Sequence, residues 1–226
     1  MTFNFDEGGF LLINKPYRWT SFDVVGLLKK KLRHKYNKKI KVGHAGTLDP
    51  LATGLLIICT GKFTKKISEF QNLEKEYTGT FTFGATTPSY DMEKPTDKTF
   101  PVNHITDEKF FLISKKFTGT FEQVPPLFSA KQIDGQRAYK FARRGETKEI
   151  KPQLITISEF DIIKITMPVV EFRVVCSKGT YIRSLARDFG AALESGAYLS
   201  ALCRTRIGKY KTEDACEIEE LEKIIT

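Results

Sequence analysis

The chain has 226 residues, of which 41% are hydrophobic and 28% charged, a composition that suits one large or two small soluble domains. No apolar run approaches the length that spans a bilayer, and residues 1–9 are acidic and polar, so we expect no signal peptide and a cytoplasmic protein. The four cysteines and three histidines have no metal-site spacing, which argues against a structural zinc. The net charge of +9 favours a polyanionic partner such as a nucleic acid.

The first predicted elements are a short apolar strand at Phe10–Ile13 and a helix that Thr20 or Ser21 can cap. Val24, Val25, Leu28 and Leu32 recur at helical spacing and predict one buried face. The opposite face and the following loop carry a run of cations with no acid between residues 24 and 41. This run either contacts phosphates or is a solvated helix face. Its members are Lys29, Lys30, Lys31, Arg33, Lys35, Lys38, Lys39 and Lys41.

The segment Gly43–Leu56, GHAGTLDPLATGLL, surrounds one carboxylate, Asp49, with glycines, threonines and a histidine. Gly43 and Gly46 let the backbone bend, and Pro50 disfavours a helical conformation at Asp49. A short buried strand is predicted directly afterwards, at residues 55–59. A charged group on a bent loop beside a rigid apolar element is typical of an active site, although Asp-Pro can also simply open a turn.

Strict alternation over Glu76–Gly84, EYTGTFTFG, predicts a strand. Tyr77 stands at its beginning, where the ring could emerge into a cleft or be one more core aromatic. The polar, proline-containing stretch Thr86–Pro101 is interpreted as a loop, with Asp91 and Asp97 within it.

A helix is predicted over Ile105–Phe117, capped by Thr106, with Phe110, Phe111, Ile113 and Phe117 as its apolar positions. An irregular segment, Val124–Arg137, then leads into a short helix, Ala138–Arg144, closed by Gly145. This region interleaves cations with aromatic residues, a pattern that suits the phosphates and unstacked bases of RNA. A surface helix with a small apolar face is the alternative. The residues concerned are Lys131, Arg137, Lys140, Arg143, Arg144, Phe128, Tyr139 and Phe141.

Two β-branched strands are predicted at Leu154–Ile165 and Val169–Cys176, followed by a turn and a helix over Tyr181–Glu194. Arg183 falls in the first turn of this helix, which is unfavourable for a cation unless a carboxylate pairs with it. The segment Leu199–Arg206 and a glutamate-rich helix at Ile218–Ile225 complete the chain. Strands outnumber helices without strict alternation, which predicts one α+β domain with a mixed, mostly antiparallel sheet.

These features together favour RNA contact and a cofactor-free reaction on a nucleic-acid base, because a well-mounted carboxylate, a tyrosine and an arginine occur without a phosphate-binding GxxxxGK[ST] loop. Six ordered blocks of the sequence resemble the TruB family of tRNA pseudouridine synthases. They are NKP…TS (Asn14–Ser21), GHAGTLDPLATGLL (Gly43–Leu56), EYTGTFTFG (Glu76–Gly84), PPLFSAKQIDGQRAYKFARRG (Pro125–Gly145), SKGTYIRSLARDFG (Ser177–Gly190) and LCRT (Leu202–Thr205).

The resemblance implies isomerisation of uridine 55 in the T loop of tRNA to pseudouridine, without a cofactor or metal. Asp49 then matches the family's nucleophile, which attacks either the uracil ring or the ribose. Arg183 would pair with Asp49 and keep it ionised and aimed. Tyr77 would stack on the target base and serve the proton transfer that completes the reaction.

The resemblance also implies substrate-binding roles for His44, Tyr181, Leu202 and Lys15. His44 would hold the RNA open with its base flipped out, unless it is a hydrogen-bonded structural imidazole. Tyr181 and Leu202 match positions that line the uridine pocket, and Lys15 is structural or near that pocket. The fold expected is one pseudouridine-synthase-type catalytic domain over residues 1–226 with an RNA-gripping thumb insertion at about 124–150. The expected RNA contacts are Lys30, Lys31, Lys131, Arg137, Arg143 and Arg144.

Three departures from the family pattern stand out. Arg18 replaces a usual glycine in KPxGxTS, so the turn differs or gains a cation near the RNA. Cys203 stands where a second arginine is common. The sequence ending at Thr226 leaves no room for the RNA-binding PUA domain of many relatives, so we expect a short form that acts on the T arm of tRNA as a monomer, without a guide RNA or a membrane.

Two competing functions remain. The enzyme could act on a different uridine or perform a different base modification, or the chain could refold tRNA without chemistry. Asp49, Tyr77 and Arg183 together argue against a pure binder, because a carboxylate among RNA phosphates costs binding through like-charge repulsion.

Overall fold

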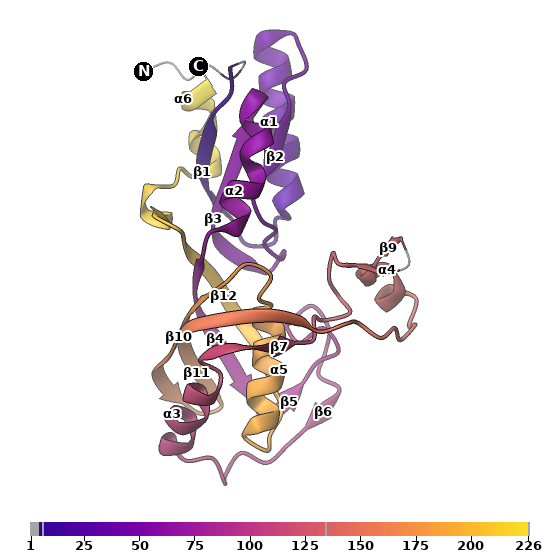
Figure 1. Cartoon of the computed structure of the whole chain (residues 1–226), viewed down its shortest axis with the longest axis vertical. Coiled ribbons are helices and arrows are strands. Elements are labelled where there is room, and N and C mark those ends of the chain that lie inside the picture. Colours follow the sequence, from indigo (N-terminus) through magenta and orange to yellow (C-terminus); the bar gives the residue numbers. More distant parts are fainter. Residues whose placement is uncertain (1–4, 6, 134, 226) are drawn as a thin grey trace. The chain divides into compact units, whose positions relative to one another are not determined.

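The structure is a computed structural model that describes residues 5, 7–133 and 135–225. The chain folds as two compact units, and Figure 1 labels helices and strands of both. Unit 1 contains Met1–Tyr77 and Leu202–Thr226, and unit 2 contains Thr78–Ala201. Most of the predicted polar N-terminus, residues 1–4 and 6, lies outside the described residues, and so does Asp134 of the predicted thumb insertion.

Unit 1 is built on a sheet in which β3 (Ala52–Thr60) has neighbours on both sides. It pairs antiparallel with β1 (Phe10–Lys15) and β2 (Val42–His44), and parallel with β12 (Ala197–Ile207). The other elements are α1 (Ser21–Tyr36), η1 (Gly61–Lys66), α2 (Ile67–Asn72), β13 (Tyr210–Lys211), η2 (Thr212–Asp214), η3 (Ile218–Glu220) and α6 (Leu221–Ile225).

Alternation along β3 divides the core of unit 1 between the two faces of the sheet. Leu56 and Ile58 belong to a cluster with the apolar stripe of α1, and Leu55 and Ile57 belong to a second cluster with Phe70 of α2. This arrangement buries β3 from Gly54 to Thr60, as the apolar sequence at residues 55–59 predicts, and fixes the backbone directly after the Asp49 loop.

Helix α1 begins where the sequence predicts, because Thr20 and Asp23 form a capping box. The Thr20 hydroxyl accepts from the Asp23 backbone N–H at 3.0 Å, and the Asp23 carboxylate accepts from the Thr20 N–H at 2.8 Å. These reciprocal bonds satisfy two backbone donors that a helix N-terminus otherwise leaves open. The helix start is therefore fixed, and the residues on either side of it can support the neighbouring loop.

Unit 2 contains Thr78–Phe83 of β4 (Lys75–Phe83) and Ala197–Ala201 of β12, and its strands have the order β12-β4-β11-β10-β7. Its core gathers phenylalanines from strands and helices, and Phe83 of β4 contacts both Phe110 and Phe189, with ring centroids 5.0 and 5.8 Å apart. The remaining elements are β5 (Ala85–Thr86), β6 (Lys98–Thr99), α3 (Asp107–Lys116), β7 (Gly119–Gln123), β8 (Gln132–Ile133), β9 (Gln136–Arg137), α4 (Ala138–Arg143), β10 (Gln153–Thr166), β11 (Val169–Cys176) and α5 (Ile182–Ala192).

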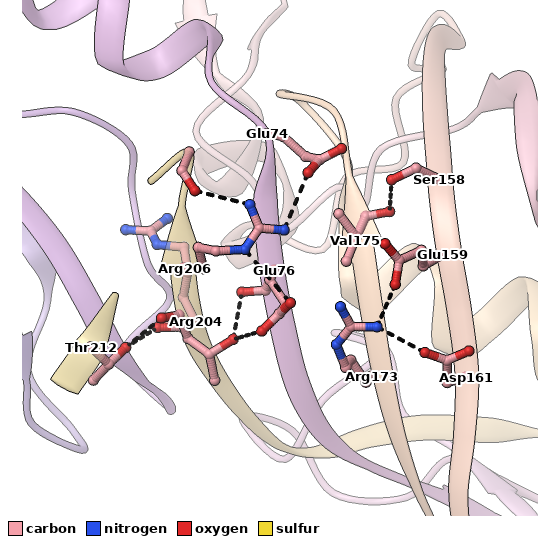
Figure 2. A network of polar contacts seen from close by, with 12 residues as sticks. Glu74, Glu76, Ser158, Glu159, Asp161, Arg173, Val175, Arg204, Arg206 and Thr212 are labelled. Atoms are coloured by element: carbon pink, nitrogen blue, oxygen red, sulfur yellow. Dashed lines mark hydrogen bonds and ion pairs between the residues drawn. The ribbon is translucent and has the colours of Figure 1, made fainter. Parts of the chain in front are cut away.

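Strands β10 and β11 pair antiparallel, and a charge network reinforces the pair on one face (Figure 2). Arg173 of β11 lies opposite Asp161 of β10, bonds to its carboxylate at 2.8 Å and also pairs with Glu159. Directly opposed charges of this kind contribute modestly to sheet stability.

The predicted fold class, an α+β chain with a mixed and mostly antiparallel sheet, is confirmed. Of the apolar positions predicted for α3, Phe110 is buried and Phe111 is 49% exposed. One local expectation was wrong, because the predicted loop at residues 86–101 contains part of the β5–β6 hairpin. In the described chain, every helix is too short or too polar to cross a membrane.

Candidate active site

The loop that carries Asp49 connects β2 to β3, and these two strands are paired with one another in the sheet. Asp49 is half-buried, and its carbonyl accepts the Ala52 backbone N–H at 3.1 Å in a turn around Pro50. Gly46 has a φ of +121°, a conformation that other residues rarely adopt. The predicted bent, non-helical backbone at Asp49 is therefore confirmed.

The start of α1 anchors this loop immediately before the carboxylate. The buried Ser21 hydroxyl accepts from the backbone N–H of Leu48 at 2.8 Å and lies 3.2 Å from the Leu48 carbonyl. Both polar backbone groups of Leu48 thus face one side chain, which restrains the residue next to Asp49. The TS pair at Thr20–Ser21 serves two purposes, since Thr20 caps the helix and Ser21 holds the loop.

Arg18 anchors the loop immediately after the carboxylate. Its backbone N–H donates to the Pro50 carbonyl at 2.8 Å, and its φ of +68° is the left-handed conformation that glycine adopts without strain. The turn therefore keeps a glycine-like backbone although arginine stands there. The exposed guanidinium lies 5.6 Å from the centre of the Tyr17 ring.

Lys15 is completely buried at the end of β1. Its ammonium donates to the carbonyls of Trp19 at 2.6 Å and Pro16 at 2.9 Å, and lies 3.5 Å from that of Pro50. Burial lowers the pKa of Lys15 from 10.5 to about 8, while the nearby charge of Asp49 acts to raise it. Lys15 thus binds backbone carbonyls on both sides of the turn that supports the Asp49 loop, and its role in the uridine pocket stays a prediction.

Arg204 of β12 is a site residue that sequence reasoning missed. Its side chain is 1% exposed, and its guanidinium donates to the Gly46 carbonyl at 3.1 Å and the Leu55 carbonyl at 2.8 Å. These acceptors lie on either side of Asp49 in the chain. The only sequence signal was an arginine in an otherwise unremarkable strand, within the LCRT block at Leu202–Thr205.

His44, at the end of β2, is half-buried. Burial lowers its pKa, the charge of Arg204 lowers it further, and a hydrogen bond with the Gly46 backbone acts in the opposite direction. The imidazole is therefore favoured as the neutral form near neutral pH. A neutral ring can enter an RNA stack without a fixed charge, but the same features also suit a structural histidine.

Tyr77 and Leu202 also belong to unit 1. Tyr77 is 9% exposed on β4, and Leu202 is half-buried beside Ala52, three residues after Asp49. The Leu202 carbonyl lies 3.4 Å from the Thr53 hydroxyl. Leu202 is consequently held next to the strand that follows the Asp49 loop.

In unit 2, Tyr181 precedes α5 and Arg183 occupies its first turn, where Arg183 is 4% exposed. The guanidinium donates to the carbonyl of Phe128 at 2.9 Å and lies 3.3 Å from that of Ser89. A carboxylate does pair with this cation: Asp91 lies 3.6 Å from Arg183 Nε and is also buried. The sequence places Asp91 in a loop and indicates no role for it, because its partner lies 92 positions later.

The predicted pair of Asp49 and Arg183 would join residues of different units and stays a prediction. So does the grouping of Tyr181 with the residues of unit 1.

The thumb insertion carries Arg137 on β9 and Arg143 at the end of α4, and these two elements project from the sheet of unit 2 (Figure 1). Arg137, Arg143 and Arg144 are exposed, and the guanidiniums of Arg143 and Arg144 lie over the rings of Tyr139 and Phe141. Arg144 also pairs with Glu146 at 2.6 Å. Lys131 is half-buried and donates to the Lys151 carbonyl at 3.0 Å, which makes it less available for RNA than these three arginines.

The predicted lysines of α1 lie on the solvent side of that helix, with Lys30 exposed and Lys31 half-buried. The structure adds cations that the sequence interpretation did not include. Gly61, the first residue of η1, donates to the Lys41 carbonyl at 2.8 Å, and this short helix exposes Lys62, Lys65 and Lys66. The basic run therefore continues beyond residue 41 into η1.

Comparison with known families identifies the family to which the chain belongs. A family model described as TruB family pseudouridylate synthase (N terminal domain) matches residues 29–182, and one described as tRNA pseudouridylate synthase B C-terminal domain matches residues 183–226. The chain belongs to the TruB family. The resemblance inferred from its six sequence blocks is confirmed.

Two relatives of this TruB-family chain cover nearly its whole length. A tRNA pseudouridine synthase B from Flavobacterium johnsoniae is 57% identical over 96% of each chain. One from Phocaeicola vulgatus is 54% identical over 96% of this chain and 92% of its own.

Among solved structures, a crystal structure of a Cbf5-Nop10-Gar1 complex superposes with a TM-score of 0.73 at 28% identity, covering 97% of this chain and 54% of that one. A structure of an H/ACA RNP bound to a substrate RNA containing 2'-deoxyuridine gives a TM-score of 0.69 at 26% identity, covering 95% and 52%. The TruB-family chain thus spans about half the length of these solved chains.

Proposed function

We propose that this tRNA pseudouridine synthase isomerises uridine 55 in the T loop of tRNA, with Asp49 as the nucleophile. Relatives that are 57% and 54% identical over nearly the whole chain carry the name tRNA pseudouridine synthase B, which supports tRNA as the substrate. The observation that carries the assignment of Asp49 is its loop, which bends at Gly46 and is hydrogen-bonded on both sides by Ser21 and Arg18. Such restraint gives a nucleophile one preferred geometry.

The reaction breaks the bond between uracil N1 and ribose C1' and forms a bond between C5 and C1'. The C5 hydrogen leaves as a proton, and N1 gains one, so no oxidant, reductant or cofactor is needed. The Asp49 carboxylate adds to the uracil ring or to the ribose and leaves again, which a carboxylate can do as both nucleophile and leaving group. Either course frees the base to rotate before it rejoins the sugar.

The other predicted residues have supporting roles in this proposal. Tyr77 stacks on the target base and serves the transfer of the C5 proton, and Arg183 pairs with Asp49 when the substrate is bound. Asp91 supports this role of Arg183, because it already holds the buried guanidinium by an ion pair at 3.6 Å.

In this proposal the target base is recognised by His44, Tyr181 and Leu202. The buried Lys15 supports the Asp49 loop. His44 holds the position that the flipped base vacates, since chemistry on a stacked base requires its extrusion.

The cations of α1 and the thumb insertion contact the backbone of the T arm in this proposal. Exposed guanidiniums over Tyr139 and Phe141 support the thumb assignment, because such groups bind phosphates and stack with unpaired bases. We further propose that the chain acts as one catalytic domain over residues 1–226, as a cytoplasmic monomer without a guide RNA.

Tritium release from tRNA transcript labelled at uracil C5 tests the proposal. Wild-type protein should release tritium from a transcript with uridine at position 55 and not from one in which that uridine is replaced. Asp49→Asn should abolish release while tRNA affinity is kept or improved, because the substitution removes a negative charge beside RNA phosphates.

Asp214→Asn is the matched control, since Asp214 is an exposed aspartate of the same unit and should leave release unchanged. Release by Asp49→Asn at the wild-type rate would overturn the assignment of the nucleophile. Release that persists without uridine 55 would redirect the proposal to another uridine, and tight binding without any release would indicate an RNA-binding protein.

A further inference from the structure

We propose that Arg204 is a positioning residue for Asp49, whose buried guanidinium ties together the two ends of the loop that presents the carboxylate. The proposal rests on the assignment of Asp49 as the nucleophile and adds to it a residue for which the sequence offered no role. Arg204 belongs to β12, so a strand from the C-terminal part of unit 1 supports a loop from its N-terminal part.

The first support is the hydrogen-bond geometry. Gly46 lies three residues before Asp49 and Leu55 six residues after it, and one guanidinium donates to both carbonyls, at 3.1 and 2.8 Å. The planar guanidinium fork restricts how the two segments can shift against one another. A lysine could satisfy one of these acceptors but could not reproduce the fork.

The second support is the glycine pattern of the loop. Gly54 has a φ of +101°, and an added Cβ there would collide with the backbone of Arg204. Gly46 turns at a φ of +121°, with its carbonyl on Arg204. Gly54 therefore provides the close approach that this arginine needs, and Gly46 provides the backbone turn at the carbonyl that the guanidinium binds.

The third support is the way in which Arg204 itself is fixed. Its own carbonyl accepts from the Thr212 hydroxyl at 2.8 Å, as Figure 2 shows, and its backbone pairs in parallel with Gly54. With an exposure of only 1%, the side chain has no freedom to serve as a surface RNA contact. The guanidinium is thus a preorganised support rather than a substrate-binding cation.

The charge of Arg204 affects the pKa of His44, a measurable quantity that simple destabilisation of the fold would not change. It is one of the two causes that lower the pKa of His44, the other and larger being burial, and it acts on Lys15 in the same direction. Asp49 and Asp23 act on Lys15 in the opposite direction. Loss of the Arg204 charge should therefore raise the pKa of His44 even in a variant that stays folded.

The test compares Arg204→Met and Arg204→Lys with the wild type in three measurements: single-turnover pseudouridine formation, tRNA affinity, and the titration of His44 by NMR. We expect Arg204→Met to slow the single turnover at least about tenfold, to change the tRNA dissociation constant less than about threefold, and to raise the His44 pKa. Arg204→Lys should also slow the reaction, because it keeps the charge but loses the fork, while His44 stays close to its wild-type pKa.

Arg206→Met is the matched control. Arg206 lies two residues further along β12 and pairs with Glu74 at 3.2 Å and Glu76 at 3.6 Å, so its loss also breaks ion pairs (Figure 2). It should leave the His44 titration and the turnover unchanged. Thermal unfolding of all variants identifies a temperature at which each is folded.

An Arg204→Lys variant with the wild-type turnover would overturn the proposal, even if Arg204→Met fails to fold. An Arg204→Met variant that is folded and matches Arg206→Met in turnover and His44 titration would overturn it as well. If the wild type forms no pseudouridine, the proposed function fails, but amide hydrogen exchange over residues 43–56 still tests the support of the loop. Unchanged exchange there in Arg204→Met would then contradict the role given to Arg204.

Discussion

At the scale of single residues, Arg18 adopts the left-handed backbone conformation that suits the glycine usual at this position of the family pattern. Its φ of +68° is costly for a residue with a side chain, by about 1 kcal/mol relative to glycine. The backbone bond from Arg18 to Pro50 maintains this conformation beside Asp49. The strain is tolerated because the buried Lys15 and the capped start of α1 fix both ends of the turn.

We therefore expect Arg18→Gly to leave the free energy of unfolding unchanged or to raise it by up to about 1 kcal/mol, since relief of strain is partly offset by the greater entropy of glycine in the unfolded chain. Urea denaturation followed by circular dichroism measures this. Lys29→Gly is the control, because this exposed residue of α1 has helical backbone and should lose about 1 kcal/mol. Equal losses for the two variants would show that the conformation of Arg18 carries no strain.

The contrast between Asp49 and Arg204 shows what sequence reasoning can find at this scale. Asp49 was identifiable because glycines and a proline beside it in the sequence dictate a bent loop. Arg204 and Asp91 were not, because their partners Gly46 and Arg183 lie far away in the sequence. Such pairs depend on strand order, which hydrophobic patterning does not specify.

At the scale of elements, helices and strands with strong local signals were predicted well. Thr20 as a cap predicted the start of α1, and the alternation of apolar and polar residues over Glu76–Gly84 predicted β4. The strand pairs β5–β6 and β8–β9 were not predicted, because strands of two residues have no periodicity to read. Phe110 and Phe111 are both apolar positions of α3 in the sequence, and packing buries only Phe110 of the two.

The junction between β7 and the thumb insertion is hydrogen-bonded to the helix that carries Arg183. Gln123, which is 1% exposed, accepts from the Tyr181 N–H at 2.8 Å and donates to the Tyr181 carbonyl at 3.2 Å. The next residue, Val124, accepts from the Ser184 hydroxyl at 2.8 Å. The start of the thumb insertion is thus linked directly to Tyr181, which precedes α5, and to Ser184, the residue after Arg183.

We expect Gln123→Glu to slow pseudouridine formation by about tenfold or more, because the carboxylate cannot donate to the Tyr181 carbonyl and a small displacement of site residues is costly. The tRNA affinity should change less than about threefold. Single-turnover kinetics and filter binding separate the two effects. Gln136→Glu, an exposed change within the thumb, is the control for the added charge. A parallel loss of affinity and rate in both variants would indicate general repulsion of RNA instead.

At the scale of the whole molecule, the net charge of +9 is spread unevenly along the chain. The stretch from residue 24 to residue 41 contains eight lysines and arginines and no acid, whereas the C-terminal segment after residue 212 is acidic. An uneven field of this kind orients a polyanion as it approaches. If α1 contacts the T arm, its lysines should account for a measurable part of the salt dependence of binding.

The double substitution Lys30→Ala/Lys31→Ala should weaken tRNA binding and reduce the slope of log K against log salt by about 1 to 2, since each phosphate contact contributes about 0.7 to 0.9 to that slope. Lys115→Ala/Lys116→Ala is the matched control, because it removes two exposed adjacent lysines from the last turn of α3. Net charge changes equally in both proteins. Equal slopes in the two double variants would therefore attribute the salt dependence to overall charge and remove α1 from the proposed RNA contacts, whereas a smaller slope in Lys30→Ala/Lys31→Ala alone would locate RNA phosphates on this helix.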